Sequence, residues 1–244
     1  MSSTPWVART SLHARLRLFC FPYAGGGSSL FRLWPQQLPP ELDVCPVLLP
    51  GRETRWHEPL FTHLPSLVQA LAEGLYPVLD VPFAFFGHSL GALIGFELAR
   101  HLARSQHAAP IHLFVAAHRA PQLPLPASPL HTLPDPEFIN ALYRLGGTPA
   151  AILHNEEMMR LMLPILRADF TLYETYIYAP GKPLACPITA FGGEQDRLVG
   201  IQELVGWREQ TTGVFTMSII PGDHFFLQSH QPPVLQAIRQ ALLL

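Results

Sequence analysis

The stretch "FFGHSLGALIGFELAR" at residues 85–100 decides the fold, because it changes from an apolar run to a helical pattern at a single serine. Gly87 and Gly91 flank Ser89 at a distance of two residues on either side, which is the spacing of a sharp strand-to-helix turn. Such a turn exposes a serine hydroxyl, and its strained backbone requires small residues at both glycine positions. The stretch therefore predicts that Ser89 is the nucleophile of an enzyme.

Two other interpretations of Ser89 are available. The tetrapeptide "GHSL" is also typical of the serine that anchors phosphopantetheine on a carrier domain, and a chance match without any chemistry is the third reading. A carrier domain resembles a small helical bundle, so it would leave most of the 244 residues unexplained. The apolar strand-like run before Ser89 and the helical pattern after it argue against both alternatives.

A serine hydroxyl is a weak nucleophile unless a base and an orienting acid activate it. The base candidate is His224 in "IIPGDHFFLQ", and the acid candidate is Asp196 in "AFGGEQDRLV"; each follows a strand-like run. The order serine, acid, histidine is the order found in α/β-hydrolases. Glu194 is the main competing acid, whereas Asp223 ranks last because side chains of adjacent residues rarely point at each other.

An enzyme of this kind also needs two backbone N–H groups that stabilise the negative charge developing on the attacked carbonyl oxygen. One is expected from Leu90, which follows the nucleophile at the start of a helix. The second is expected from the loop "FPYAGGG", at Ala24 or, as the nearby alternative, at Tyr23. The same glycines do not have the spacing of a P-loop or a dinucleotide-binding loop, so nucleotide binding is a weak competitor.

Strand-like and helix-like segments alternate along the chain, which predicts a mostly parallel sheet flanked by helices. We expect one α/β-hydrolase domain over residues 1–244. The expected strands are 16–21, 43–52, 81–89, 111–117, 187–193 and 214–222, and the expected helices are 28–38, 64–79, 90–104 and 232–244.

Residues 119–178 interrupt this alternation and are predicted to form a helical lid inserted into the domain. This part is proline-rich at first and then helical over 135–147 and 155–178. Its second helix is apolar nearly all round, which indicates either burial against the core or an adaptable lining for an acyl chain. The residues concerned are Met158, Met159, Leu161, Met162, Ile165 and Leu166.

Composition argues against several other classes of protein. The net charge is −2 without strong clustering, so no nucleic-acid surface is expected. No apolar run approaches the length of a membrane span, and no signal peptide is apparent. Cys20, Cys45 and Cys186 are widely spaced in apolar surroundings, which favours reduced cysteines and a cytoplasmic location. None of the 12 histidines has a metal-ligand spacing, so we expect neither a metal nor another cofactor.

The motifs together resemble the stand-alone type II thioesterases of polyketide and non-ribosomal peptide synthesis. The resemblance covers nearly the whole chain and rests on "FCFPYAGGGSSLFRLW", "LLPGRETRWHEP", "FFGHSLGALIGFELAR", "RAPQLP", "LGGTPAAIL", "LPILRADFTLYETY", "CPITAFGGEQD" and "PGDHFFL". The catalytic serine, aspartate and histidine of that family fall on Ser89, Asp196 and His224. Gln195 stands in an acid loop that is often richer in acidic residues in relatives, and it leaves Asp196 the clearer choice.

The resemblance implies hydrolysis of stalled or wrong acyl groups from the phosphopantetheine arms of carrier domains. The implied partner is the acylated carrier of a synthase, and the implied state is a monomer. Arg32, Arg52 and Arg55 are candidates for contacts with the arm's phosphate or an acidic carrier surface, although solvated surface arginines are the commoner case. The alternatives are a small-molecule carboxylesterase or lipase, and a carrier-binding scaffold without turnover. A catalytic triad does not distinguish thioesters from oxygen esters, so that distinction depends on the resemblance.

Overall fold

Six apolar segments pair side by side in one parallel sheet. The computed structural model describes residues 4–8, 10–11, 13–105, 108–125, 129–147 and 153–243. Within them the strand order is β2-β1-β3-β4-β5-β6, and every neighbouring pair is parallel. The strands are β1 Leu16–Phe21, β2 Leu42–Pro46, β3 Phe83–His88, β4 Leu113–Ala116, β5 Ile188–Gly193 and β6 Phe215–Ile220. This confirms the predicted parallel sheet and its six strands.

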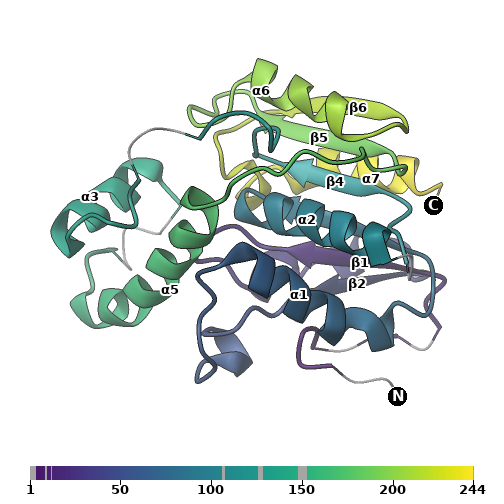
Figure 1. The fold of residues 1–244 in the computed structure, drawn as a ribbon. Coiled ribbons are helices and arrows are strands. Elements are labelled where there is room, and N and C mark those ends of the chain that lie inside the picture. Colours follow the sequence, from purple (N-terminus) through teal and green to yellow (C-terminus); the bar gives the residue numbers. More distant parts are fainter. Residues whose placement is uncertain are drawn as a thin grey trace.

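Helices cover both faces of the sheet, with α1 and α2 on one side and α7 on the other (Figure 1). Consecutive side chains of a strand point to opposite faces, so Phe85 packs in the core under α1 and α2 while Phe86 packs in the core on the α7 side. Both phenylalanines are fully buried. The bounds of these helices are α1 Leu64–Leu75, α2 Leu90–Ser105 and α7 Gln231–Ala241.

The predicted helix over 28–38 is wrong. The chain there forms two short 3-10 helices, η1 Ser28–Phe31 and η2 Trp34–Gln36. Phe31 and Trp34 are the buried residues of these turns, and their spacing of three residues fits the three-residue turn of a 3-10 helix. Further short helices are η3 Glu53–Arg55, η4 Tyr76–Val78, α6 Ile201–Val205, η5 Gly206–Gln210 and η6 Phe226–Gln228.

The helices α3 Asp135–Leu145 and α5 Glu156–Glu174 lie at one end of the sheet, apart from its two covered faces (Figure 1). Both end earlier than predicted, and the left-handed Gly146 (φ 78°) follows the end of α3. The two helices share a small apolar cluster of their own, made by Phe138, Leu142, Met159 and Leu166. Residues 126–128 and 148–152 of the predicted insertion, like 1–3, 9, 12, 106–107 and 244, lie outside the described residues.

The three cysteines carry free thiols, and burial raises the pKa of each. Each therefore stays a neutral thiol at neutral pH, a poor nucleophile. Within the described part of the chain, no helix is both long and apolar enough to cross a membrane. The described residues also contain no group of three or more histidine, cysteine or acidic side chains arranged to hold a metal ion.

Candidate active site

Ser89 stands in the turn between β3 and α2, with a positive φ of 53°. Its neighbours have no room for a side chain, because a Cβ on Gly87 would lie 2.2 Å from the carbonyl oxygen of Gly91. A Cβ on Gly91 would lie 2.1 Å from the carbonyl oxygen of Phe21. The backbone N–H of Ser89 donates to the carbonyl of Ala116 on β4 at 2.8 Å. These contacts fix the strained backbone that presents the hydroxyl.

The structure brings the three predicted triad residues into one chain of hydrogen bonds. The hydroxyl of Ser89 lies 3.1 Å from Nε2 of His224, and Nδ1 of His224 lies 2.9 Å from Oδ2 of Asp196. Asp196 follows β5 and His224 follows β6, so both loops emerge at the same edge of the parallel sheet as the serine turn. With a carboxylate at Nδ1, the imidazole carries its proton there, and Nε2 is free to accept the serine proton.

The environment of Asp196 keeps it ionised. Its side chain is fully buried, and burial alone would raise its pKa, but the hydrogen bond from His224 and the charge of that imidazole outweigh this effect. Oδ1 also accepts the backbone N–H groups of Leu198 at 2.8 Å and Val199 at 3.1 Å. The net result is a pKa below the usual value, so the carboxylate is charged whenever His224 needs its support.

Neither competing acid reaches His224. Glu194 is exposed, and the side-chain hydrogen bond that the structure shows for it comes from Gln195 at 3.4 Å. Asp223 is the residue next to the histidine, but its carboxylate accepts the backbone N–H of Phe225 at 2.8 Å. Asp196 is therefore the carboxylate that orients the imidazole.

His88 is a functional neighbour that the sequence analysis does not single out. It is fully buried, and its Nε2–H donates to the backbone carbonyl of His224 at 2.8 Å. Burial and the nearby imidazole of His224 lower the pKa of His88 to about 3, so the ring is neutral. Its contact with the loop after β6 helps to hold His224 in place. The one feature of the sequence that could have indicated this role is the position of His88 directly before Ser89.

The two expected oxyanion donors lie beside the nucleophile. Leu90 is the first residue of α2, so its N–H has no acceptor within the helix. No hydrogen bond within the described residues uses the N–H of Ala24. Leu90, Ala24 and the alternative Tyr23 all line the same cavity as Ser89. The choice of Ala24 over Tyr23 stays a prediction.

The glycine loop after β1 is tied to α5 by a buried ion pair. Both terminal nitrogens of Arg52 contact the carboxylate of Asp169 at 2.8 Å, and one of them also donates to the carbonyl of Gly26 at 3.1 Å. The same carboxylate accepts the N–H of Gly25 at 2.7 Å. The pair therefore fixes the position of the backbone that is expected to supply an oxyanion donor.

The expectation for Arg52 and Arg55 is corrected by these contacts. Both arginines are 7% exposed, so they are neither solvated nor available to a phosphate. Arg55 donates to the carboxylate of Glu58 and to the carbonyl of Leu48, each at 2.8 Å, and its guanidinium stacks over the ring of Trp6. The reason is that each guanidinium satisfies buried acceptors. Arg32 is exposed, and its contact with a partner stays a prediction.

A cavity of about 310 Å³ opens beside Ser89 and is walled by α3, α5 and the loops after the strands. Most of its wall is apolar, from Leu125, Leu130, Leu142, Leu145, Leu166, Phe170, Leu198, Val199 and Phe225. Of the six residues expected to line an acyl site, Leu166 lies in this wall. Met158 and Leu161 are 41% and 48% exposed, while Met162 lines a neighbouring cavity over the glycine loop.

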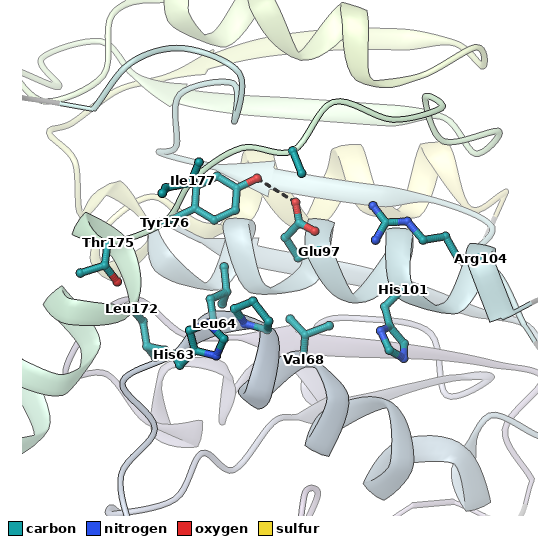
Figure 2. A pocket seen from close by; sticks show the side chains of 12 residues that line it. His63, Leu64, Val68, Glu97, His101, Arg104, Leu172, Thr175, Tyr176 and Ile177 are labelled. Atoms are coloured by element: carbon teal, nitrogen blue, oxygen red, sulfur yellow. Dashed lines mark hydrogen bonds between the residues drawn. The ribbon is translucent and has the colours of Figure 1, made fainter.

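A further cavity, of about 320 Å³, lies between α1, α2 and the chain that follows α5 (Figure 2). The hydroxyl of Tyr176 donates to Glu97 at 2.7 Å. Further polar side chains in the cavity wall are His63, His101, Arg104 and Thr175. None of the triad residues lines it. Catalysis is therefore assigned to the cavity beside Ser89.

Known proteins resemble this chain in both sequence and fold. Residues 16–242 match the thioesterase domain family. The chain is 46% identical over 241 residues to the gramicidin S biosynthesis protein GrsT of Aneurinibacillus migulanus, covering 98% of this chain and 94% of that protein. It is 44% identical over 247 residues to a protein of Brevibacillus parabrevis named linear gramicidin dehydrogenase LgrE, covering 99% and 94%.

Among solved structures, BorB, the type II thioesterase of the borrelidin biosynthetic cluster, superposes with a TM-score of 0.88. It is 36% identical, and the match covers 97% of each chain. The parallel sheet, the strained serine turn and these likenesses lead to one assignment. The chain belongs to the thioesterase domain family and is a serine hydrolase of the α/β-hydrolase fold.

Proposed function

We propose that this protein hydrolyses stalled or wrong acyl thioesters on the phosphopantetheine arms of carrier domains in a polyketide or non-ribosomal peptide synthase. The observation that carries the proposal is the hydrogen-bonded chain Ser89–His224–Asp196 at the wall of an apolar cavity, in a chain of the thioesterase family. The names of GrsT and BorB support the carrier-bound substrate, since both belong to such biosynthetic systems. The acylated carrier is the proposed partner, and the proposed active form is a monomer in the cytoplasm.

In the first half of the reaction, the oxygen of Ser89 attacks the thioester carbonyl carbon while Nε2 of His224 takes the hydroxyl proton. The carbonyl oxygen becomes an oxyanion, and the N–H groups of Leu90 and Ala24 stabilise it. Asp196 stabilises the imidazolium that forms. The carbon–sulfur bond then breaks, and His224 returns the proton to the departing sulfur, giving the free thiol of the arm and an acyl-serine. A thiol with a pKa near 8.5 leaves with little assistance.

In the second half, a water molecule gives a proton to Nε2 of His224 and attacks the acyl carbon. The bond between that carbon and the Ser89 oxygen breaks, the proton returns to the serine, and the free acid leaves. The cycle needs no metal and no other cofactor, because every proton moves between the substrate, water, Ser89 and His224. We therefore propose that the protein acts without a cofactor.

The name of LgrE raises a dehydrogenase as a second candidate, and the glycine loop argues against it. A dinucleotide site uses free backbone N–H groups to bind a pyrophosphate. Here the N–H of Gly25 donates to Asp169 at 2.7 Å, and that of Ser28 donates to Glu53 at 3.1 Å. The donors are thus occupied, and two carboxylates would repel the pyrophosphate. The remaining alternative is a carboxylesterase, which differs in the leaving group.

The leaving group is tested by comparing one acetyl group on three supports: a carrier domain, coenzyme A and a short oxygen ester. We expect kcat/KM to fall in that order, because binding of the arm and the carrier surface can orient the carbonyl. Ser89→Ala should lower kcat by about 10⁶, as in other triads, whereas Ser66→Ala, at an exposed serine on α1, is the matched control. A preference for the oxygen ester would contradict the thioesterase proposal.

A further inference from the structure

The cavity beside Ser89 is large compared with an acetyl group and is lined mainly by apolar side chains. Its volume is about 310 Å³. A methylene group fills about the same volume as a water molecule, roughly 30 Å³, so the cavity has room for about ten of them. An acetyl group, whose chain is a single methyl, would leave most of this space unfilled. The leucines in the wall are Leu90, Leu125, Leu130, Leu142, Leu145, Leu166 and Leu198.

The charged side chains of the wall already have partners within the protein. One carboxylate oxygen of Glu174 accepts the N–H of Leu130 at 2.8 Å. The other accepts the N–H of His131 at 2.9 Å and lies 2.6 Å from Nδ1 of that residue. The guanidinium of Arg119 contacts the carboxylate of Glu203 at 2.9 Å. A charged group on the acyl chain would therefore have to compete with these contacts.

The neutral polar side chains of the wall add little for an acyl chain to bind. The hydroxyl of Tyr23 accepts from the side-chain amide of Gln228 at 3.0 Å. Nε2 of His118 and Nε of Arg119 have no partner among the described residues, but both atoms are buried beneath the surface of the wall. Tyr173 keeps a hydroxyl for which the described residues supply no hydrogen bond. Outside the triad, the wall therefore favours an uncharged and mostly apolar group.

Apolar burial rewards a longer acyl chain until the cavity is full. Complete transfer of one methylene from water to an apolar phase is worth about fourfold in an equilibrium constant, and half of that effect is about twofold. Binding energy from the unreactive part of a substrate raises kcat/KM. Each added methylene should therefore raise kcat/KM, and the volume of the cavity sets the length at which this gain ends.

We propose that the enzyme prefers apolar acyl chains of about six to ten carbons, the length that fills this cavity. The inference rests on the proposed function, because it names the substrate class of the same site. Leu145 is a suitable residue for testing the limit. It is the last residue of α3, lines the cavity and is half-buried, so a larger side chain there fills space beside the chain without entering the core of the sheet.

The test measures kcat/KM for N-acetylcysteamine thioesters of acetic, butyric, octanoic and dodecanoic acid, below the concentrations at which they aggregate. Octanoyl should exceed butyryl about tenfold, at about twofold for each of the added methylenes. Dodecanoyl should show no further gain, because the cavity is already full. The 8-aminooctanoyl thioester should be hydrolysed about tenfold more slowly than octanoyl, since both oxygens of Glu174 already accept hydrogen bonds.

A variant with a smaller cavity tests whether the wall sets this preference. Leu145→Trp should lower the ratio of octanoyl to butyryl kcat/KM about fivefold, because the indole occupies space that the longer chain needs. Leu161→Trp is the matched control, since Leu161 on α5 is 48% exposed and does not line the cavity, and it should keep the wild-type ratio. If circular dichroism shows that Leu145→Trp does not fold, Leu125→Trp, at another half-buried residue of the wall, replaces it with the same expected fall.

Several results would overturn this inference and leave the thioesterase proposal intact. They are a maximum at acetyl, equal values for butyryl and octanoyl, a continued rise to dodecanoyl, faster hydrolysis of 8-aminooctanoyl than of octanoyl, and an unchanged ratio in the cavity-filling variant. A different result would contradict the proposed function itself: no hydrolysis of any of these thioesters by the wild type, as by Ser89→Ala.

Discussion

The sheet and the pair α3–α5 are held together in different ways. The sheet packs large aromatic side chains on both faces, and residues such as Phe19, Phe86 and Phe114 are wholly buried. The cluster between α3 and α5 has four buried members, while Met158 and Leu161 on α5 remain exposed. The triad loops come from the sheet, whereas much of the apolar cavity wall comes from α3 and α5. The catalytic residues therefore lie on loops of the extensively packed sheet, whereas much of the cavity wall lies on the less extensively packed pair α3–α5.

Charged contacts partly replace apolar packing in the second region. Arg167 on α5 pairs with Asp135 at the start of α3 at 2.6 Å, and His131 contacts Glu174 at 2.6 Å. The link from α5 to the glycine loop is again an ion pair, between Arg52 and Asp169. Apolar burial does not depend on the ionisation of side chains or on the screening of charges, whereas exposed ion pairs weaken as salt rises. The contrast predicts that the two regions respond differently to the same perturbation.

The largest effect should come from the sheet-borne triad. Asp196→Asn should lower kcat by about 10⁴, because an amide favours the wrong tautomer of His224. The free energy of unfolding should change far less. Steady-state hydrolysis of acetyl-coenzyme A measures the effect, and Glu194→Gln on the same loop is the matched control. Near-normal turnover by Asp196→Asn combined with loss of turnover in Glu194→Gln would reverse the assignment of the acid.

Breaking the ion pair between Arg52 and Asp169, which links the two regions, should have the next largest effect. Arg52→Leu leaves Asp169 buried without its partner, which should destabilise the fold by about 3–5 kcal/mol. Replacing both, as Arg52→Met with Asp169→Leu, should restore most of that stability. The double variant should nevertheless remain impaired in kcat, since the N–H of Gly25 and the carbonyl of Gly26 lose their shared anchor. Urea unfolding and kcat measure the two effects, and full activity in the double variant would show that the anchor does not serve the site.

Acid should weaken the sheet region through its buried histidines. Burial lowers the pKa of His112 to about 4, whereas in the unfolded chain it is about 6.5. Between these values the unfolded state binds an extra proton, so the free energy of unfolding falls by about 1.4 kcal/mol per pH unit as pH decreases. Urea unfolding at pH 7, 5.5 and 4.5 should show a shallower decline in His112→Phe than in the wild type. An identical slope would mean that His112 does not contribute to the acid sensitivity.

The smallest effect is expected within the α3–α5 pair. The side chains of Arg167 and Asp135 are 30% and 65% exposed, so Arg167→Ala should cost about 1 kcal/mol or less. The change should appear locally, as faster amide hydrogen exchange in α3 and α5 with unchanged exchange in β1 and β3. Exchange that is equally slow in all four elements of the wild type, with and without an acylated carrier, would count against a lid function for residues 119–178.

The parts of this fold that follow local rules could be read from the sequence. Continuous apolar runs predicted the six strands, and a serine between two glycines predicted the strained turn at Ser89. The order of Ser89, Asp196 and His224, together with the position of each after a strand-like run, predicted that they meet, because loops after parallel strands collect at one edge of the sheet. These predictions needed only local sequence patterns and the geometry of a parallel sheet, and they needed no knowledge of contacts between distant residues.

The errors concern long-range contacts and short helices. Arg52 reads as a surface residue because its partner Asp169 lies 117 positions later in the chain. The turns at 28–38 read as one helix because burial of Phe31 and Trp34 fits both an α-helical and a 3-10 spacing, and Pro35 did not resolve the ambiguity. His88 gave no periodic signal, since its role depends on the backbone carbonyl of His224, which lies beside it only in the folded chain.

The ion pair between Arg52 and Asp169 also has a consequence for the order in which activity appears during folding. Contacts between residues far apart in sequence form slowly, because a long loop must close first. A chain whose sheet is complete but whose α5 has not yet docked would already align Ser89, His224 and Asp196. It would still lack the clamp on the loop that carries Ala24. Recovery of hydrolysis after dilution from urea should therefore lag behind recovery of the native far-ultraviolet circular dichroism, and the length of the lag reports the docking of α5.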